Sequence, residues 1–184
     1  MSYFKVSFFT LVGLLFCAGC GLESTKVAEG FLEISYQFNQ PQEFQPSFQT
    51  VIWLEDRDGK FLRSLLVSEY LAFDAYDQLE ICSTWSKVAD WENVPEAEFD
   101  AITMPTPDIG ANVFKVDCAK EKLTPGVYHY GIEVHIADDY NVMYRGKITI
   151  GRKDVENLPE ISYNPGKLEG AENIISNVKA RYYR

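Results

Sequence analysis

The chain has 184 residues, of which 46% are hydrophobic and 14% aromatic, and its formal net charge is −10 at pH 7. A chain of this length buries enough apolar surface to form one stable domain without disulfides or metal ions. The excess of acidic side chains repels phosphate backbones and anionic lipid surfaces, which excludes nucleic acid as an expected partner.

The N-terminal end of the chain has the pattern of a secretory leader. Lys5 supplies the positive start, residues 6–16 form an apolar run too short to span a bilayer, and the small residues Ala18 and Gly19 precede Cys20. The Ala-Gly-Cys sequence resembles the cleavage and lipidation box of bacterial lipoproteins, which are cut before the cysteine and carry a diacylglyceryl group on its sulfur.

We therefore expect a signal peptide over residues 1–19, a lipidated tether over 20–29 and a single domain over 30–184. This places the protein in the bacterial cell envelope, anchored to a membrane by lipid and facing the periplasm. Cys17 stands where the lipoprotein box usually has Leu, and with Cys20 it also forms a C-x-x-C spacing. Redox pairs of that kind belong at the start of a helix in a folded domain, so we favour lipidation.

The first part of the domain predicts three strands. Residues 30–38 alternate between apolar and polar side chains, which is typical of a strand with one buried face. Residues 48–55 are apolar on both faces and predict a central strand. The "DRDGK" sequence predicts a hairpin turn, because Asp58-Gly59 suits positive φ, and residues 61–67 return as the next strand.

The second part predicts four more strands, the first of which follows a proline-rich loop near Asn112 and ends at Cys118. Residues 128–136 alternate clearly, and the "ADDYN" sequence turns the chain into a strand that continues the buried face to Ile150. Apolar residues at every second or fourth position between Ile174 and Tyr182 predict a last strand. Residues 83–93 form the one segment with a helical pattern, with Trp85 among its apolar residues, and Pro95 limits its length. The fold class that follows is all-β, an antiparallel sandwich with one short helical insert covering one end.

Several short motifs resemble a family of predicted periplasmic proteins whose domain has no assigned function. They are "VIWLEDRDGKFLRSL", "DAITMPTPDIG" and "LTPGVYHYGIEVHI", and the resemblance covers residues 30–151. The second half is also similar to the immunoglobulin-like module of flagellar hook-capping proteins. These resemblances imply an immunoglobulin-like β-sandwich. They also imply a partner among envelope membrane proteins, in systems that contain PepSY-type proteins and flavin transferases.

The "DAITMPTP" sequence resembles the acceptor motif of those transferases, Asp-x-x-Ser/Thr-Gly-Ala-Thr/Ser, whose last hydroxyl receives FMN. Asp100, Thr103 and Thr106 match it, which makes Thr106 the candidate attachment site. Met104 and Pro105 replace the small residues that the motif requires, and proline stiffens the loop. We therefore expect a proline-rich structural loop and no bound cofactor, with covalent FMN as the alternative.

Other candidate sites are few. His129, Glu133 and His135 lie on one face of their predicted strand, within reach of a common metal ion. Basic residues of the next strand disfavour a cation, and a three-residue turn would place Arg145 opposite Glu133 as an ion pair. We therefore expect no metal site, and the sequence contains no recognisable catalytic set.

Cys82 and Cys118 are the two thiols that remain once Cys20 carries lipid. An oxidising envelope favours a disulfide between them, which would close a ring around the predicted helix and the proline-rich loop. The alternative is two separate buried cysteines. Together, these features predict a non-catalytic, lipid-anchored binding partner in an envelope redox system, with an FMN-bearing electron carrier as the second hypothesis.

Overall fold

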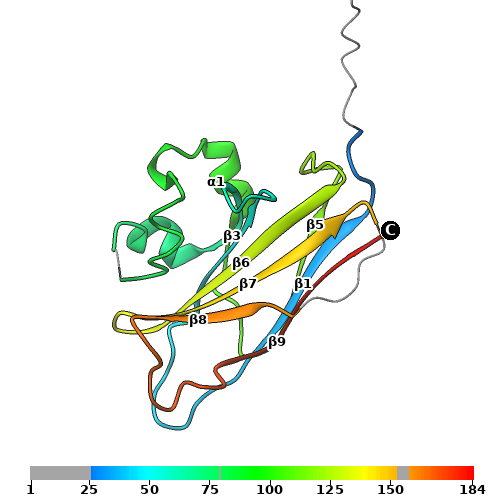
Figure 1. Ribbon diagram of the computed structural model, residues 1–184. Helices are drawn as coiled ribbons and strands as arrows, with labels where there is room; N and C mark the ends of the chain where they lie inside the picture. The colour runs from blue at the N-terminus through cyan, green and yellow to red at the C-terminus, as the bar shows by residue number, and fades with distance from the viewer. Residues whose placement is uncertain (1–25, 79, 153–157) are drawn as a thin grey trace, which may run out of the picture.

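The computed structural model describes residues 26–78, 80–152 and 158–184, whose strands form two β-sheets packed against each other (Figure 1). One sheet has the strand order β5-β1-β9 and the other β4-β3-β2-β6-β7-β8. The predicted sandwich-like arrangement is confirmed. The predicted signal peptide and the lipidation site Cys20 lie outside the described residues.

The smaller sheet consists of β1 (Phe31–Phe38), β5 (Gly110–Asp117) and β9 (Ile175–Tyr183), all paired antiparallel. The larger sheet consists of β2 (Gln49–Glu55), β3 (Phe61–Ser68), β4 (Thr103–Met104), β6 (Gly126–Ala137), β7 (Tyr140–Ile150) and β8 (Glu160–Asn164). Its pairs are antiparallel except for β3 and β4, which run parallel.

The main hydrophobic cluster lies between the two sheets, where alternate residues of each strand point inward. The strands β1, β2, β6, β7 and β9 supply most of it, including Leu32, Ile34, Leu54, Tyr130, Ile132, Val134, Ile148, Val178 and Ala180. These are the inward positions predicted from the two-residue period, so the strand assignments and the final strand are confirmed.

The strand β2 is buried along its whole length and lies between β3 and β6, as its apolar character predicts. The hairpin that follows it is also confirmed. Gly59 in its turn has φ +83°, a conformation that favours glycine, and its N–H donates to the Asp56 carbonyl at 3.1 Å.

The hairpin between β6 and β7 has a different register from the predicted one. Asp138, with φ +51°, and Asp139 form a tight turn, and the pairing shifts between His135 and Ala137. As a result Glu133 lies opposite Met143 and not opposite Arg145. The predicted ion pair between Glu133 and Arg145 is therefore wrong.

The helical segments also differ from the prediction. They comprise a π-helix, η1 (Leu71–Ala75), a 3₁₀ turn, η2 (Trp91–Asn93), and an α-helix, α1 (Glu96–Ile102), while most of residues 83–93 form turns. Pro95 caps the start of α1, because its carbonyl accepts the N–H groups of Glu98 and Phe99, both at 2.9 Å. Proline is well tolerated at the beginning of a helix, so it begins this helix instead of ending an earlier one.

Candidate interaction surface on the six-stranded sheet

Residues 69–102, here called the insert, cover the outer face of the larger sheet over β2 and β3 (Figure 1). The prediction that the insert covers one end of the sandwich is therefore wrong. The sheet contributes Val51, Trp53 and Val67, which are fully buried. The insert contributes a second group of buried side chains: Leu71, Ala72, Ala75, Ile81, Cys82, Trp85, Ala89 and Trp91. This separate cluster explains why β2 is apolar on both faces.

Two tryptophans of the insert use their indole N–H groups as anchors. Trp85 donates to the Ser64 hydroxyl of β3 at 2.8 Å, and Trp91 donates to the Ala72 carbonyl at 3.0 Å. The ring of Trp91 also contacts those of Trp85 and Phe99, with centroid distances of 5.3 Å in both pairs. These contacts attach η1, η2 and α1 to the sheet as one packed layer.

Two polar side chains of the hairpin β6–β7 bind the backbone of the insert. Glu133 accepts the N–H groups of Thr84 and Trp85, and Asn141 accepts the N–H of Cys82 at 2.8 Å. The Asn141 amide also donates to the Glu80 carbonyl at 2.7 Å. The backbone polar groups of this irregular segment thereby find partners in the sheet, as buried backbone groups require.

Glu133 is completely buried, and burial raises the pKa of its carboxyl above the ordinary value. The hydrogen bonds from Trp85 and Thr84 and the charge of Lys87 act in the opposite direction without cancelling the effect of burial. This carboxyl is a structural anchor beneath the insert and not a solvent-facing ligand.

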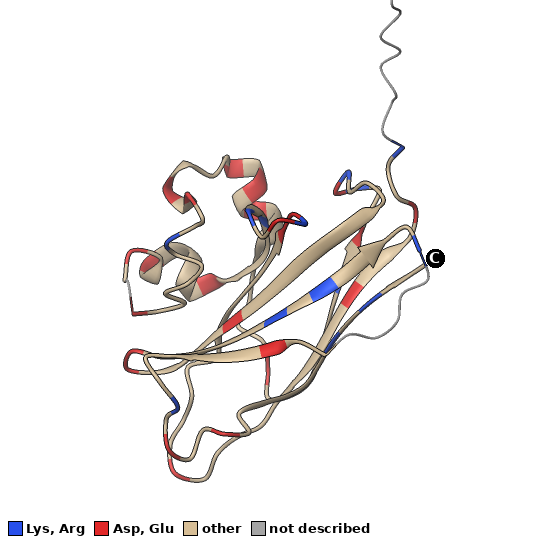
Figure 2. Ribbon diagram, in the orientation of Figure 1, with Lys and Arg blue, Asp and Glu red and all other residues tan. Residues whose placement is uncertain are grey.

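The outer surface of the insert is strongly acidic. Its sequence contains nine Asp or Glu residues, whereas Lys87 is its one basic residue. The acidic residues are distributed over its helices and turns (Figure 2). The acidic "WENVPEAEFD" sequence, residues 91–100, is part of this surface, and its Asp and Glu side chains are all exposed. The clustering of charge was visible in the sequence, but its position on the sheet was not.

Apolar side chains are exposed on the same insert. Tyr70 is 46% exposed, Phe73 58% and Val88 50%. The Phe73 ring lies against Phe99 of α1, with a centroid distance of 4.9 Å. Exposed apolar patches rimmed by polar residues mark interaction sites, and an acidic rim is electrostatically complementary to a basic partner.

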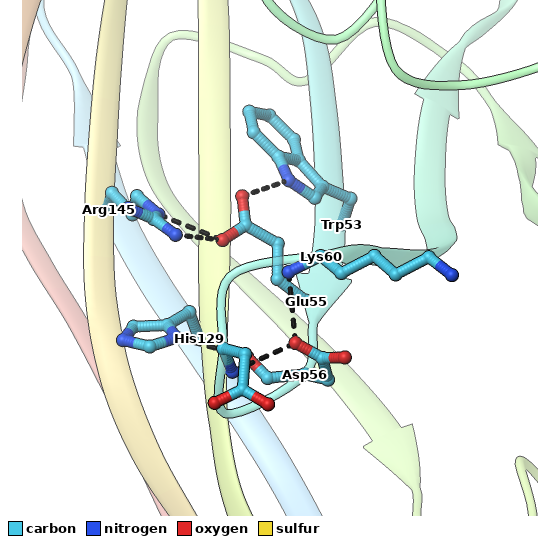
Figure 3. A network of polar contacts seen from close by, with 7 residues as sticks. Trp53, Glu55, Asp56, Lys60, His129 and Arg145 are labelled. Carbon is cyan, nitrogen blue, oxygen red and sulfur yellow. Dashed lines mark hydrogen bonds and ion pairs between the residues drawn. The ribbon is translucent and has the colours of Figure 1, made fainter.

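The three residues considered as metal ligands have different surroundings. Glu133 lies beneath the insert, while His135 contacts Ser47 and the Asp138 carbonyl. The His129 ring contacts the Asp56 carbonyl at 3.1 Å (Figure 3). Among residues 26–78, 80–152 and 158–184, no group of three His, Cys, Asp or Glu side chains is placed to hold a metal ion. The sequence placed these three side chains on one face of their strand within reach of a common ion, but the insert covers Glu133, which is completely buried.

Arg145 binds Glu55 at the end of β2 (Figure 3). Its Nε donates to Glu55 Oε2 at 2.9 Å, and its terminal nitrogen contacts the same oxygen. The other oxygen, Oε1, accepts the indole N–H of Trp53 at 3.0 Å. Gly131, opposite Arg145, leaves room for the Trp53 ring, which a Cβ at that position would meet at 2.3 Å. Through Trp53, this network joins the hydrophobic cluster beneath the insert to Arg145 on β7.

The residues of the flavin acceptor motif lie on three different segments. Asp100 is exposed on α1, Thr103 belongs to β4, and Thr106 lies in the loop that leads to β5. The Gln49 amide donates to the Thr106 hydroxyl at 3.0 Å, so this loop is attached to β2. Covalent FMN on Thr106 remains an alternative prediction.

Cys82 and Cys118 are both free thiols, so the predicted disulfide is not formed. Cys82 belongs to the cluster beneath the insert, whereas Cys118 belongs to the cluster between the sheets. Burial and the charge of Glu133 raise the pKa of the Cys82 thiol well above its ordinary value. Each cysteine acts as a small apolar core residue, which is the alternative interpretation given above.

A serine and a histidine that the sequence did not associate lie together at the start of β2. The exposed Ser47 hydroxyl is 2.6 Å from His135 Nδ1, and His135 Nε2 is 2.8 Å from the Asp138 carbonyl. Such contacts resemble a nucleophile, a base and an orienting group. The same hydroxyl is also placed to donate to the His135 carbonyl at 2.9 Å, and the Ser47 N–H donates to Ile136. These bonds attach the incoming chain to β6.

The comparisons with known proteins find no matching family model, no matching curated protein and no matching solved structure. Within the described part of the chain, no helix combines the length and apolar character needed to cross a membrane.

Proposed function

We propose that this protein is a non-catalytic, lipid-anchored adaptor of the bacterial cell envelope. It binds a membrane protein through the acidic outer surface of the insert. The observation that carries this proposal is the concentration of acidic charge and exposed aromatic side chains on one firmly attached layer of the sheet. The resemblance of the sequence motifs suggests that the partner belongs to a PepSY- and flavin-linked redox system.

The proposal includes an immunoglobulin-like fold, which the order of the strands supports. In that fold, strands B and E are neighbours in one sheet, and C, F and G follow one another in the other. The strands β1 and β5 take the places of B and E, and β2, β6 and β7 take those of C, F and G. The strand β3 corresponds to C′, and β9 lies beside β1 at the position of strand A.

A tyrosine near the start of β6 supports the same fold. The Tyr128 hydroxyl donates to the Thr124 carbonyl at 2.9 Å, four residues upstream. Immunoglobulin-like domains often have such a tyrosine corner at the start of strand F. The buried tryptophan of β2 differs from that pattern, because Trp53 packs beneath the insert and not between the sheets.

The lipid anchor is tested by substituting Cys20. Wild-type protein made in a bacterium should partition into detergent and carry a lipid on its first mature residue, as measured by mass spectrometry. The Cys20→Ala variant should remain unprocessed or become soluble. If this variant partitions and migrates like the wild type, the lipoprotein assignment is wrong.

Partner binding is tested with a purified PepSY-type membrane protein from the same envelope, by measuring its affinity for the lipoprotein in detergent. Neutralising four acidic residues of the insert, Glu92, Glu96, Glu98 and Asp100, should weaken binding at least tenfold. The matched control neutralises the exposed residues Glu43, Asp139, Glu169 and Glu172, which are outside the insert. Equal effects of both variants, or no binding by the wild type, would contradict the proposed partner.

A further inference from the structure

The described chain begins at one end of the sandwich, here called the tether end, which comprises residues 26–33, 54–63, 115–130, 147–152 and 181–184. Strand pairing brings these segments together, since Phe31 lies beside Asp117 and Tyr183, and Gly126 lies beside Ile150. The loop between β5 and β6, the start of β1 and the C-terminus lie at this end in Figure 1.

The tether end is basic although the chain as a whole is acidic. Its segments contain eleven Lys or Arg residues and seven Asp or Glu residues. The rest of the described chain contains four basic and seventeen acidic residues. Much of that acidic charge lies on the insert, away from the start of β1 (Figure 2). The molecule therefore has a basic end and a larger acidic remainder.

Several acidic side chains of the tether end are bound by the protein itself. Asp56 Oδ1 accepts the N–H groups of Asp58 and Lys60, both at 2.9 Å. Asp117 Oδ1 similarly accepts the N–H groups of Ala119 and Lys120, at 2.9 and 3.1 Å. Glu33 is 7% exposed and lies between Lys115 and Arg181. These carboxylates are directed toward the backbone or the sheet.

Exposed basic side chains outnumber exposed acidic ones in the loops and chain ends at the tether end. The exposed acidic residues there are Glu29, Asp58 and Asp117, and Asp58 pairs with Arg57. Lysine and arginine have long side chains that extend further from the backbone than aspartate does. The exposed basic residues of these loops and ends are Lys26, Arg57, Lys60, Lys120, Lys122, Arg152 and Arg184.

We propose that the tether end docks on the anionic phospholipid headgroups of the membrane, which directs the acidic remainder away from the bilayer. This inference rests on the lipid anchor of the proposed function, which would hold residue 26 close to the surface. Headgroup phosphates attract nearby Lys and Arg side chains, and the attraction falls off within a Debye length. Anionic lipid repels the chain as a whole, as its net charge predicts, but attracts this end.

The test uses residues 20–184 coupled through Cys20 to maleimide lipid in vesicles. Both sheets and both hydrophobic clusters are formed by residues 28–183, so this chain contains the whole described fold. Cys82 and Cys118 are buried, so we expect maleimide to couple at Cys20 and not at these thiols. Because the attachment is chemical, the result does not depend on whether cells lipidate Cys20.

The vesicles are phosphatidylcholine alone, or a mixture of phosphatidylcholine and phosphatidylglycerol, whose headgroup is anionic. Lysine acetylation by an amine-reactive reagent is followed by mass spectrometry. On anionic vesicles, labelling of Lys60, Lys120 and Lys122 should fall several-fold, while Lys87 and Lys167 should be unchanged. High salt should remove the difference.

Two double variants with the same change in net charge complete the experiment. Arg57→Glu with Arg152→Glu should abolish the protection of Lys120 on anionic vesicles, whereas Lys87→Glu with Lys167→Glu should leave it intact. Equal protection on neutral vesicles, or loss of protection in both variants, would overturn the proposal. Protection that appears only after an acidic protein is added would assign this end to a protein partner instead.

Discussion

The Glu133 carboxylate on β6 accepts the backbone N–H of Trp85 at 2.9 Å, so a buried acidic side chain of the sheet holds a turn of the insert. The same carboxylate accepts the N–H of Thr84, at 3.0 and 3.1 Å from its two oxygens. Glu133 is thereby joined to Trp85 and Thr84, which precede it by 48 and 49 positions in the chain, at the base of the proposed interaction surface.

Replacing Glu133 by Ala should destabilise the protein by about 3 kcal/mol, because two buried N–H groups lose their acceptor. Urea unfolding followed by tryptophan fluorescence measures the effect, and Trp53, Trp85 and Trp91 all report from the cluster beneath the insert. Glu160→Ala, which removes an exposed carboxylate from β8, should cost less than about 0.5 kcal/mol. Similar losses in both variants would show that Glu133 does not anchor the insert.

The buried position of Glu133 also predicts a dependence of stability on pH. Burial raises the pKa of this carboxyl above its ordinary value of 4.5, so the folded state disfavours ionisation. The favourable contribution of Glu133 to the free energy of unfolding is fully present at a pH below its pKa in the unfolded chain. This contribution is lost as the pH rises through the higher pKa that Glu133 has in the folded protein.

The Glu133→Gln variant keeps a hydrogen-bond acceptor but cannot ionise. The stability of the wild type relative to this variant should therefore fall as pH rises above about 4.5. Urea unfolding at a series of pH values gives the difference. A constant difference, or one that rises with pH, is incompatible with a raised pKa at Glu133.

The two-residue period predicted most strands because each inward residue enters the same cluster between the sheets. It also predicted that β2 is buried on both faces, but it could not identify what covers the second face. The insert has no regular period, since turns, a π-helix and a 3₁₀ turn follow one another before α1. The short strand β8 was missed because it is an exposed edge strand whose apolar residues include Ile161, 52% exposed.

The candidate site depended on contacts between distant segments, which a local pattern does not contain. The sequence placed Glu133 on the outer side of its strand, which is its position in the fold. It did not reveal that Thr84 and Trp85 cover it. The same limit applies to Ser47 and His135, which are 88 residues apart, and to the assignment of Cys82 and Cys118 to separate clusters.

A pair of tyrosines provides a test of the core between the sheets. The Tyr144 hydroxyl donates to the Ile175 carbonyl at 3.0 Å and so links β7 to β9, whereas the buried Tyr130 hydroxyl has no partner in the described part of the chain. Tyr144→Phe should cost about 1 kcal/mol, and Tyr130→Phe should increase stability by up to about 1 kcal/mol. Chemical unfolding measures both, and the opposite order of the two effects would contradict this packing.

The contact between Ser47 and His135 allows a direct test of the non-catalytic proposal. If the Ser47 hydroxyl only attaches the incoming chain to β6, a fluorophosphonate probe should not label the folded protein. A serine hydrolase measured in parallel confirms that the probe is reactive. Labelling of the wild type that is lost in both Ser47→Ala and His135→Ala would identify an activated serine and refute the proposal.

The last prediction concerns Thr106 and the alternative of covalent FMN. The Thr106 hydroxyl is bound to Gln49, and Pro105 and Pro107 restrict the backbone on either side. A transferase would have to detach this loop from β2 before it could reach the hydroxyl. Co-expression with a flavin transferase, followed by intact mass measurement, should therefore show no added FMN. The variant Met104→Gly with Pro105→Ala restores the small residues of the acceptor motif, and it should gain FMN if loop stiffness is the barrier. Flavin on the wild-type chain that disappears in Thr106→Ala would instead establish the protein as an electron carrier.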